Sequence, residues 1–261
     1  MHEKFVAAVI EKIKADPGCI GLAAGGSWIN NQIDEFSDID LILVTASSIS
    51  HDFQLMYNYA QGFGNLLNAF TGEHVGEKRL LICIYDDPLV HVDIKFITLE
   101  ELAFRVEDPV ILWDRDGSIA GMINRTKSAW PEFSFQFVED RFWTWIHYAA
   151  LKIGRGELFE ALDFLSFLRI TALAPLMQIK NRQLPRGVRR IEQNFPEKDL
   201  EFMKTTIASY SYESVIAAIE QSVDLYRALR LELFPKGVLL RSKTEARCLE
   251  YFYQIKARVI D

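Results

Sequence analysis

Two carboxylates in an otherwise apolar strand constrain this chain more than any other feature. The segment Asp38-Ile-Asp-Leu-Ile-Leu-Val44 is typical of a strand. Because strand side chains alternate between faces, Asp38 and Asp40 share one face, with Cα atoms ~6.5–7 Å apart. The apolar run after Asp40 indicates a largely buried strand, where two like charges repel each other unless a cation offsets them. We therefore expect a sheet that holds a divalent metal ion here.

A glycine turn precedes this strand. The apolar segment 19–24 runs into Gly25-Gly26-Ser27, and ten residues separate Ser27 from Asp38. Glycine has no Cβ, so backbone N–H groups in such a turn can approach a phosphate closely. A lone glycine turn or a lone Asp-x-Asp is most often only a turn or a solvated edge. Their combination predicts that Gly26 and Ser27 bind phosphate.

The chain changes character near residues 130–135. Before Trp130-Pro131 the pattern alternates helices and strands, and afterwards it is helical throughout. We predict an α+β protein: a small mixed-sheet domain over residues 1–133, with four or five strands, followed by an all-helical bundle of about five helices over 134–261. The expected strands span 19–24, 38–44, 80–85, 89–97 and 110–113, and the expected early helices span 3–15, 51–70 and, from a capping box at Thr98 and Glu101, about 99–106.

Composition and charge narrow the functional classes. The 261 residues are 49% hydrophobic and 25% charged, as in a soluble globular protein. Residues 1–133 carry 10 Lys and Arg against 20 Asp and Glu, whereas residues 134–261 carry 19 against 16. An acidic half disfavours attraction to phosphate backbones and favours metal ions or cationic small molecules. Nucleic acid is therefore not an expected partner.

Location is inferred from three negative features of the sequence. The longest uncharged run, 53–72, contains five Asn and Gln residues and is not a membrane span. The N-terminus lacks an apolar segment followed by a cleavage site. Cys19, Cys83 and Cys248 are widely spaced and form no Cys-x-x-Cys pair. We expect a cytoplasmic protein without a membrane anchor.

The Gly-Ser pair, followed after ten residues by Asp-hydrophobic-Asp, resembles the signature of the DNA polymerase β-like nucleotidyltransferase superfamily. The resemblance predicts a third carboxylate on a later strand, and Asp93 in His91-Val-Asp-Ile-Lys-Phe96 supplies it. The layout, with a helical bundle after the sheet, is similar to the lincosamide and streptomycin (aminoglycoside) adenylyltransferases.

This resemblance implies an Mg²⁺- or Mn²⁺-dependent enzyme that transfers an NMP, with ATP as the expected donor, to a hydroxyl of a small molecule such as an aminoglycoside or lincosamide-like antibiotic. It implies that Asp38, Asp40 and Asp93 hold the metal and that Gly26 and Ser27 hold phosphates. It also implies that Asp93 accepts the hydroxyl proton. The resembled enzymes often carry glutamate there, so base, metal ligand or both stay open for Asp93. Residues 134–261 would clamp substrate or nucleotide.

Other functions compete with this interpretation. The same chemistry could act on a protein side chain or an RNA end, although no basic stripe favours RNA. A non-catalytic nucleotide-binding or antitoxin-like module is a further alternative, but such a module has no physical need for three carboxylates. Zinc at His74 and His91 lacks a supporting His or Cys pair. The sequence leaves the acceptor, the nucleotide base and the oligomeric state open.

Overall fold

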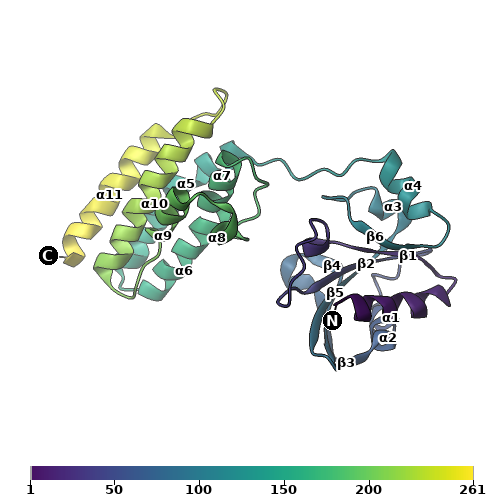
Figure 1. The fold of residues 1–261 in the computed structure, drawn as a ribbon. Coiled ribbons are helices and arrows are strands. Elements are labelled where there is room, and N and C mark those ends of the chain that lie inside the picture. The colour runs from purple at the N-terminus through teal and green to yellow at the C-terminus, as the bar shows by residue number, and fades with distance from the viewer. Residues whose placement is uncertain (1, 261) are drawn as a thin grey trace. The chain divides into compact units, whose positions relative to one another are not determined.

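The computed structural model describes residues 2–260 and divides the chain into two compact units, Met1–Pro131 and Glu132–Asp261. We call them the sheet unit and the helical unit. Figure 1 shows that all strands belong to the first unit and that the second consists of helices and loops.

The sheet unit is built on one mixed sheet of six strands. Its order is β3-β4-β5-β2-β1-β6, in which β2 and β5 run parallel and every other neighbouring pair runs antiparallel. This arrangement confirms the predicted α+β class with a mixed sheet. The strands are β1 (Cys19–Ala24), β2 (Ile39–Thr45), β3 (Asn65–Gly72), β4 (Glu77–Asp86), β5 (Val90–Thr98) and β6 (Val110–Asp114).

Helices cover the two faces of the sheet unequally. On one face, α1 (His2–Lys14) and α2 (Phe53–Phe63) pack against alternate residues of β2 and β5 such as Leu41 and Ile94. On the other face, α3 (Leu99–Leu102) and α4 (Ser118–Arg125) form a smaller cluster around Val44 and Ile97, toward the ends of the same two strands. Alternation therefore leaves the beginnings of β2 and β5 outside this smaller cluster, and Asp40 and Asp93 lie there.

The prediction of one element is wrong. The expected helix over 51–70 is helix α2 followed by the edge strand β3, so the sheet has six strands and not four or five. The break falls at Gly64, where the backbone is extended (φ 179°) and an added Cβ would lie 3.2 Å from the Tyr85 ring. The apolar spacing of residues 65–70 fits a helix as well as a strand, and pairing with β4 holds them in the strand conformation.

The capping box is present, but its helix is shorter than expected. Thr98 Oγ1 accepts from the Glu101 backbone N–H and Glu101 Oε2 accepts from the Thr98 N–H, at 3.3 and 2.8 Å, yet α3 ends at Leu102 and not near Val106. Arg105, three residues after the end of α3, donates to the Ile123 and Thr126 carbonyl groups. These bonds tie the chain after α3 to the end of α4.

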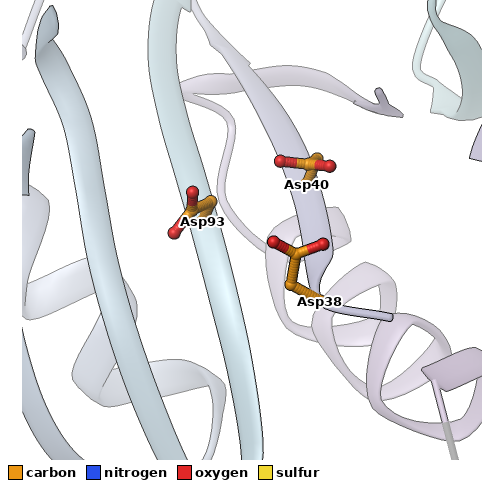
Figure 2. A group of neighbouring side chains, drawn as sticks. All are labelled: Asp38, Asp40 and Asp93. Atoms are coloured by element: carbon orange, nitrogen blue, oxygen red, sulfur yellow. The ribbon is translucent and has the colours of Figure 1, made fainter. Parts of the chain in front are cut away.

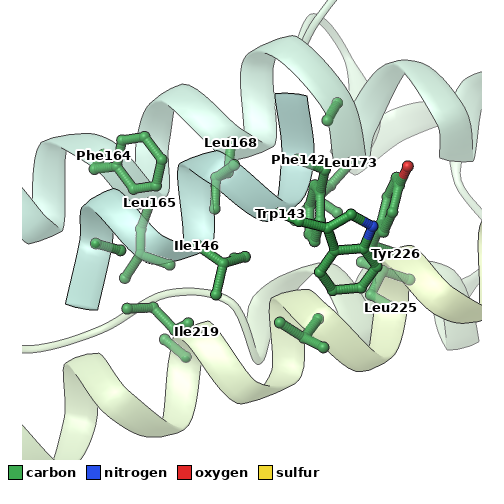
Figure 3. Packing of buried hydrophobic residues seen from close by; sticks show 14 of the residues in the cluster. Phe142, Trp143, Ile146, Phe164, Leu165, Leu168, Leu173, Ile219, Leu225 and Tyr226 are labelled. Carbon is green, nitrogen blue, oxygen red and sulfur yellow. The ribbon is translucent and has the colours of Figure 1, made fainter. Parts of the chain in front are cut away.

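The helical unit packs around an aromatic centre. Phe142 and Tyr226 stack with ring centroids 3.7 Å apart, and Trp143 meets Tyr226 edge-on (Figure 3). The elements are α5 (Phe135–Gly154), α6 (Leu158–Leu168), the π-helical η3 (Arg169–Leu173), α7 (Ala174–Lys180), α8 (Ile191–Asn194), α9 (Glu197–Lys204), α10 (Tyr212–Leu233) and α11 (Ser242–Ile260).

A buried carboxylate connects these helices. Glu139 is fully buried and accepts hydrogen bonds from Tyr226 Oη (2.6 Å), Trp143 Nε1 (3.3 Å), Arg230 Nη1 (3.3 Å) and the Arg241 N–H (2.8 Å). Burying a charge costs free energy unless it is paired and hydrogen-bonded. Four donors and the Arg230 cation meet that condition.

The stretch Leu158–Lys180 is long and apolar enough to cross a membrane by length and composition alone. More than half of its most apolar window is buried within the protein, and Leu165, Leu168 and Leu173 belong to the core of the helical unit. The core helix of a soluble protein passes the same test, so this stretch is weak evidence for a membrane span.

Candidate active site

The parallel pairing of β2 and β5 brings two of the predicted carboxylates side by side. Asp40 and Asp93 are direct partners in the register of these strands, and Asp38 lies just before β2, two residues from Asp40. One carboxylate oxygen from each residue lies within 4.8 Å of the others (Figure 2). All three residues are half-buried. The structure thus brings together the three residues that the sequence singled out as a metal site.

The glycine turn lies against Asp40. Gly26 adopts a left-handed conformation (φ +56°), and a Cβ built there would lie 1.8 Å from Asp40 Oδ2. The Gly25 N–H donates to the Asp40 carbonyl oxygen at 2.9 Å. Both the backbone conformation and the close approach therefore require glycine at position 26.

Ser27 follows inside a single 3₁₀ turn, η1 (Gly26–Trp28). It is only 5% exposed, and its Oγ has no hydrogen-bond partner among residues 2–260. The Trp28 Nε1 is buried and unpartnered in the same way. Buried polar atoms are normally hydrogen-bonded, so an unpartnered hydroxyl beside a glycine turn suits a bound polar ligand.

His91 stabilises the ionised form of Asp93. Burial raises the pKa of the Asp93 carboxyl, while His91 opposes this effect through charge and through a 2.9 Å hydrogen bond between its Nε2 and Asp93 Oδ1. The nearby Asp38 charge raises the pKa further. Because an ionised carboxylate only accepts hydrogen bonds, His91 is the donor. A cation between the carboxylates would offset the remaining repulsion.

A hollow of about 330 Å³ adjoins the triad and is lined by both Asp38 and His91. Phe36 and Leu89, which are 88% and 68% exposed, stand at its border. The side chain of Asp34 accepts from the Phe36 N–H and the Ser37 hydroxyl, at 2.9 and 3.0 Å. This turn presents Phe36 to solvent next to the carboxylates.

Sequence reasoning missed the bond from His91 to Asp93. The two residues are two positions apart on one strand, the same spacing that placed Asp38 and Asp40 together, so the signal was available. The zinc alternative at His74 and His91 finds no support: within residues 2–260 the triad is the one cluster of three or more potential metal ligands, and it contains no histidine.

A mixed sheet with a glycine-serine turn packed on a triad of carboxylates, followed by a helical unit, is the arrangement of a nucleotidyltransferase. The model of the streptomycin adenylyltransferase family matches residues 1–253. The chain belongs to that family and is an enzyme of the adenylyltransferase type.

Comparisons with solved structures and with curated sequences give weaker information than the family model. A crystal structure of an aminoglycoside 6-adenyltransferase from Bacillus subtilis is similar, with 13% sequence identity and a TM-score of 0.37 over 99% of this chain and 97% of the other. No curated protein sequence matches the chain.

Proposed function

We propose that this enzyme transfers AMP from ATP to a hydroxyl group of a small, polyhydroxylated and cationic molecule, with an aminoglycoside such as streptomycin as the first candidate. The family name supports this acceptor class. The acidic character of the first 133 residues, 10 basic against 20 acidic side chains, favours a cation over RNA. The observation that carries the proposal is the convergence of Asp38, Asp40 and Asp93.

The donor set fits a hard divalent cation. The three carboxylates have oxygens within 4.8 Å of one another, and Mg²⁺ and Mn²⁺ prefer such oxygen ligands. Ser27, directly after Gly26, has a hydroxyl oxygen without a hydrogen-bond partner in residues 2–260. We assign Asp38, Asp40 and Asp93 to this cation. When bound, Mg²⁺ or Mn²⁺ would neutralise phosphate charge and polarise the phosphoryl oxygens.

The protein's own residues perform the remaining steps in this proposal. Gly26 and Ser27 hold phosphate oxygens through the backbone N–H groups of the turn and the Ser27 hydroxyl. Asp93 accepts the proton of the acceptor hydroxyl. At the same time the oxygen of that hydroxyl forms a bond to the α-phosphorus. The bond from the α-phosphorus to the bridging oxygen breaks, and pyrophosphate leaves with that electron pair. Burial raises the pKa of Asp93, which makes it a better proton acceptor than an exposed aspartate.

His91 occupies one of the two Asp93 oxygens. Oδ1 accepts the His91 hydrogen bond at 2.9 Å, so the other oxygen is the one available to cation or acceptor. The proposal gives Asp93 both functions, because a carboxylate oxygen has two lone pairs and can ligate a cation and accept a proton. We assign the sheet unit to catalysis and the helical unit to holding substrate or nucleotide.

Membership of an enzyme family removes the non-catalytic alternative. Transfer to a protein side chain or an RNA end is tested together with the main proposal. The purified enzyme is incubated with Mg²⁺, ATP and streptomycin, and the products are analysed by mass spectrometry. We expect streptomycin that carries one AMP group, and no product from Asp40→Asn. AMP attached to the enzyme itself or to added RNA, without a streptomycin product, would mean that the acceptor is a protein or RNA and not a small molecule. Full activity of Asp40→Asn would refute the proposed site.

A further inference from the structure

The helical unit contains a hollow to which the proposed function assigns no residue. It has a volume of about 390 Å³ and lies among α6, η3, α8, α9 and the residues beside them. Its floor includes the buried Ile191 and Met203, 7% and 2% exposed. Ile170, Val188 and Ile207 at its border are 51%, 39% and 62% exposed. Every apolar residue that lines it is aliphatic.

A half-buried arginine without an acidic partner borders this hollow. Arg169 Nη1 donates to the Thr206 carbonyl oxygen at 2.6 Å, and its Nη2 donates to Ser166 Oγ at 2.9 Å. Neither acceptor carries a charge, and no carboxylate lies within ion-pair distance in the described part of the chain. Burial lowers the pKa of Arg169, as expected for a cation that is partly removed from water and has no carboxylate beside it among the described residues.

Three other cations of the same unit form ion pairs with acids. Lys180 pairs with Asp199 at 2.6 Å, and Arg230 pairs with Glu245 at 2.8 Å. Lys204, which also lines the hollow, pairs with Glu201 at 2.6 Å. Glu192 lines the hollow too, but it is exposed and forms no ion pair with Arg169. Arg169 has hydrogen bonds but no counter-ion within residues 2–260, so an anion from outside the chain would be favourable beside it.

We propose that this hollow binds an aliphatic carboxylate, with the anion on Arg169 and the hydrocarbon part against Ile191 and Met203. A guanidinium has five N–H donors, and the two bonds above leave three for a carboxylate. The aliphatic walls favour an alkyl chain, because a nucleotide base prefers aromatic surfaces on which to stack. The site is independent of the adenylyl transfer proposed above.

Octanoate is the probe, measured by calorimetry on the full chain, with octan-1-ol as its uncharged counterpart. We expect octanoate to bind more tightly than octan-1-ol. Arg169→Met should weaken octanoate binding ~10-fold or more and leave octan-1-ol binding within ~2-fold, since only the carboxylate forms a charge-assisted bond with the arginine. Arg155→Met, which removes a 69% exposed arginine of the same unit, is the matched control and should leave octanoate unchanged.

A second variant covers the case in which Arg169→Met disturbs the fold. Ile207→Asp changes an exposed residue and places an anion at the border of the hollow, so it should weaken octanoate and not octan-1-ol. The proposal is overturned if octanoate does not bind the wild-type protein, or if neither variant changes its affinity. It is also overturned if ATP displaces octanoate competitively, because the hollow would then belong to the nucleotide site.

Discussion

Asp40 and Asp93 are direct partners across the parallel strands β2 and β5, although 52 residues separate them in the chain. The rest of the candidate site is built around this pair: Asp38 two residues before Asp40, Gly26 packed on Asp40, and His91 bonded to Asp93. Each contact can be removed separately, so the contribution of each to metal binding and turnover can be measured.

Gly26→Ala should abolish turnover and destabilise the enzyme. The new Cβ would overlap the Asp40 carboxylate, 1.8 Å from Oδ2, at a position with φ +56°. Gly117→Ala is the control, because Gly117 also has positive φ (+80°) but nothing lies within 4 Å of its added Cβ. That variant should lose only ~1–2 kcal/mol of unfolding free energy and remain active. Equal losses of activity would show that the contact with Asp40 has no catalytic importance.

His91→Leu should reduce both Mn²⁺ affinity and kcat, by ~10–100-fold, as expected when a residue that orients a metal ligand is lost. The KM for ATP should change little. His91→Gln keeps a side-chain N–H donor and should recover much of the loss. Mn²⁺ titration followed by electron paramagnetic resonance measures the Mn²⁺ affinity, and initial rates measure kcat. Wild-type behaviour of the leucine variant would mean that the 2.9 Å contact with Asp93 does not orient that carboxylate.

Glu77 should make stability depend on acid pH. Hydrogen bonds and charge from Arg79 and Lys95 lower its pKa from 4.5 to about 2 in the folded protein. The folded state therefore binds fewer protons than the unfolded state between these values, so the stabilisation is complete above about pH 4.5 and is lost as the pH falls toward 2. Urea midpoints at about pH 6 and about pH 3 should differ less for Glu77→Gln than for the wild type. An identical difference would contradict the assignment.

Glu139→Ala should destabilise the helical unit by ~3–5 kcal/mol, since it leaves buried donors and the Arg230 cation without their acceptor. Asp140→Ala removes the neighbouring acid, whose pKa is lowered by hydrogen bonds from Gln136 and Arg241 at the surface, and should change stability little. Chemical denaturation measures both. Similar effects of the two substitutions would mean that the four bonds to Glu139 add nothing beyond a surface interaction.

Local patterns predicted the main features of the site. Alternation along a strand placed Asp38 and Asp40 on one face, and the resemblance to nucleotidyltransferases supplied Asp93. The capping box at Thr98 formed as expected because it depends only on residues three apart. The Asp38 and Asp40 placement and the capping box depend only on nearby residues, whereas Asp93, separated from Asp40 by 52 residues, was reached through the resemblance.

Features that depend on distant partners were missed. Strand β3 is identified by its pairing with β4, because its own apolar spacing also fits a helix. Helix α4 was not predicted; Asp114 accepts from the Ile119 and Ala120 N–H groups at its start, at 3.3 and 2.9 Å, five and six residues away in sequence. The partners of Glu139 lie up to 102 residues away. The partners of β3 and of Glu139 lie beyond any local pattern, whereas the contacts of Asp114 are local and could have been recognised.

The central claim is that Asp38, Asp40 and Asp93 hold the divalent cation of an adenylyltransferase, and Mn²⁺ titration of the wild-type enzyme and of Asp40→Asn, in the presence of ATP, tests it most directly. Loss of one of three repelling charges should leave the melting temperature of the metal-free variant equal or higher, which establishes that it is folded. Asp87→Asn, a change of an exposed acid in the same unit, is the control. We predict that Asp40→Asn lowers Mn²⁺ affinity by ~100-fold or more while the control does not. Unchanged Mn²⁺ affinity in folded Asp40→Asn would contradict the claim.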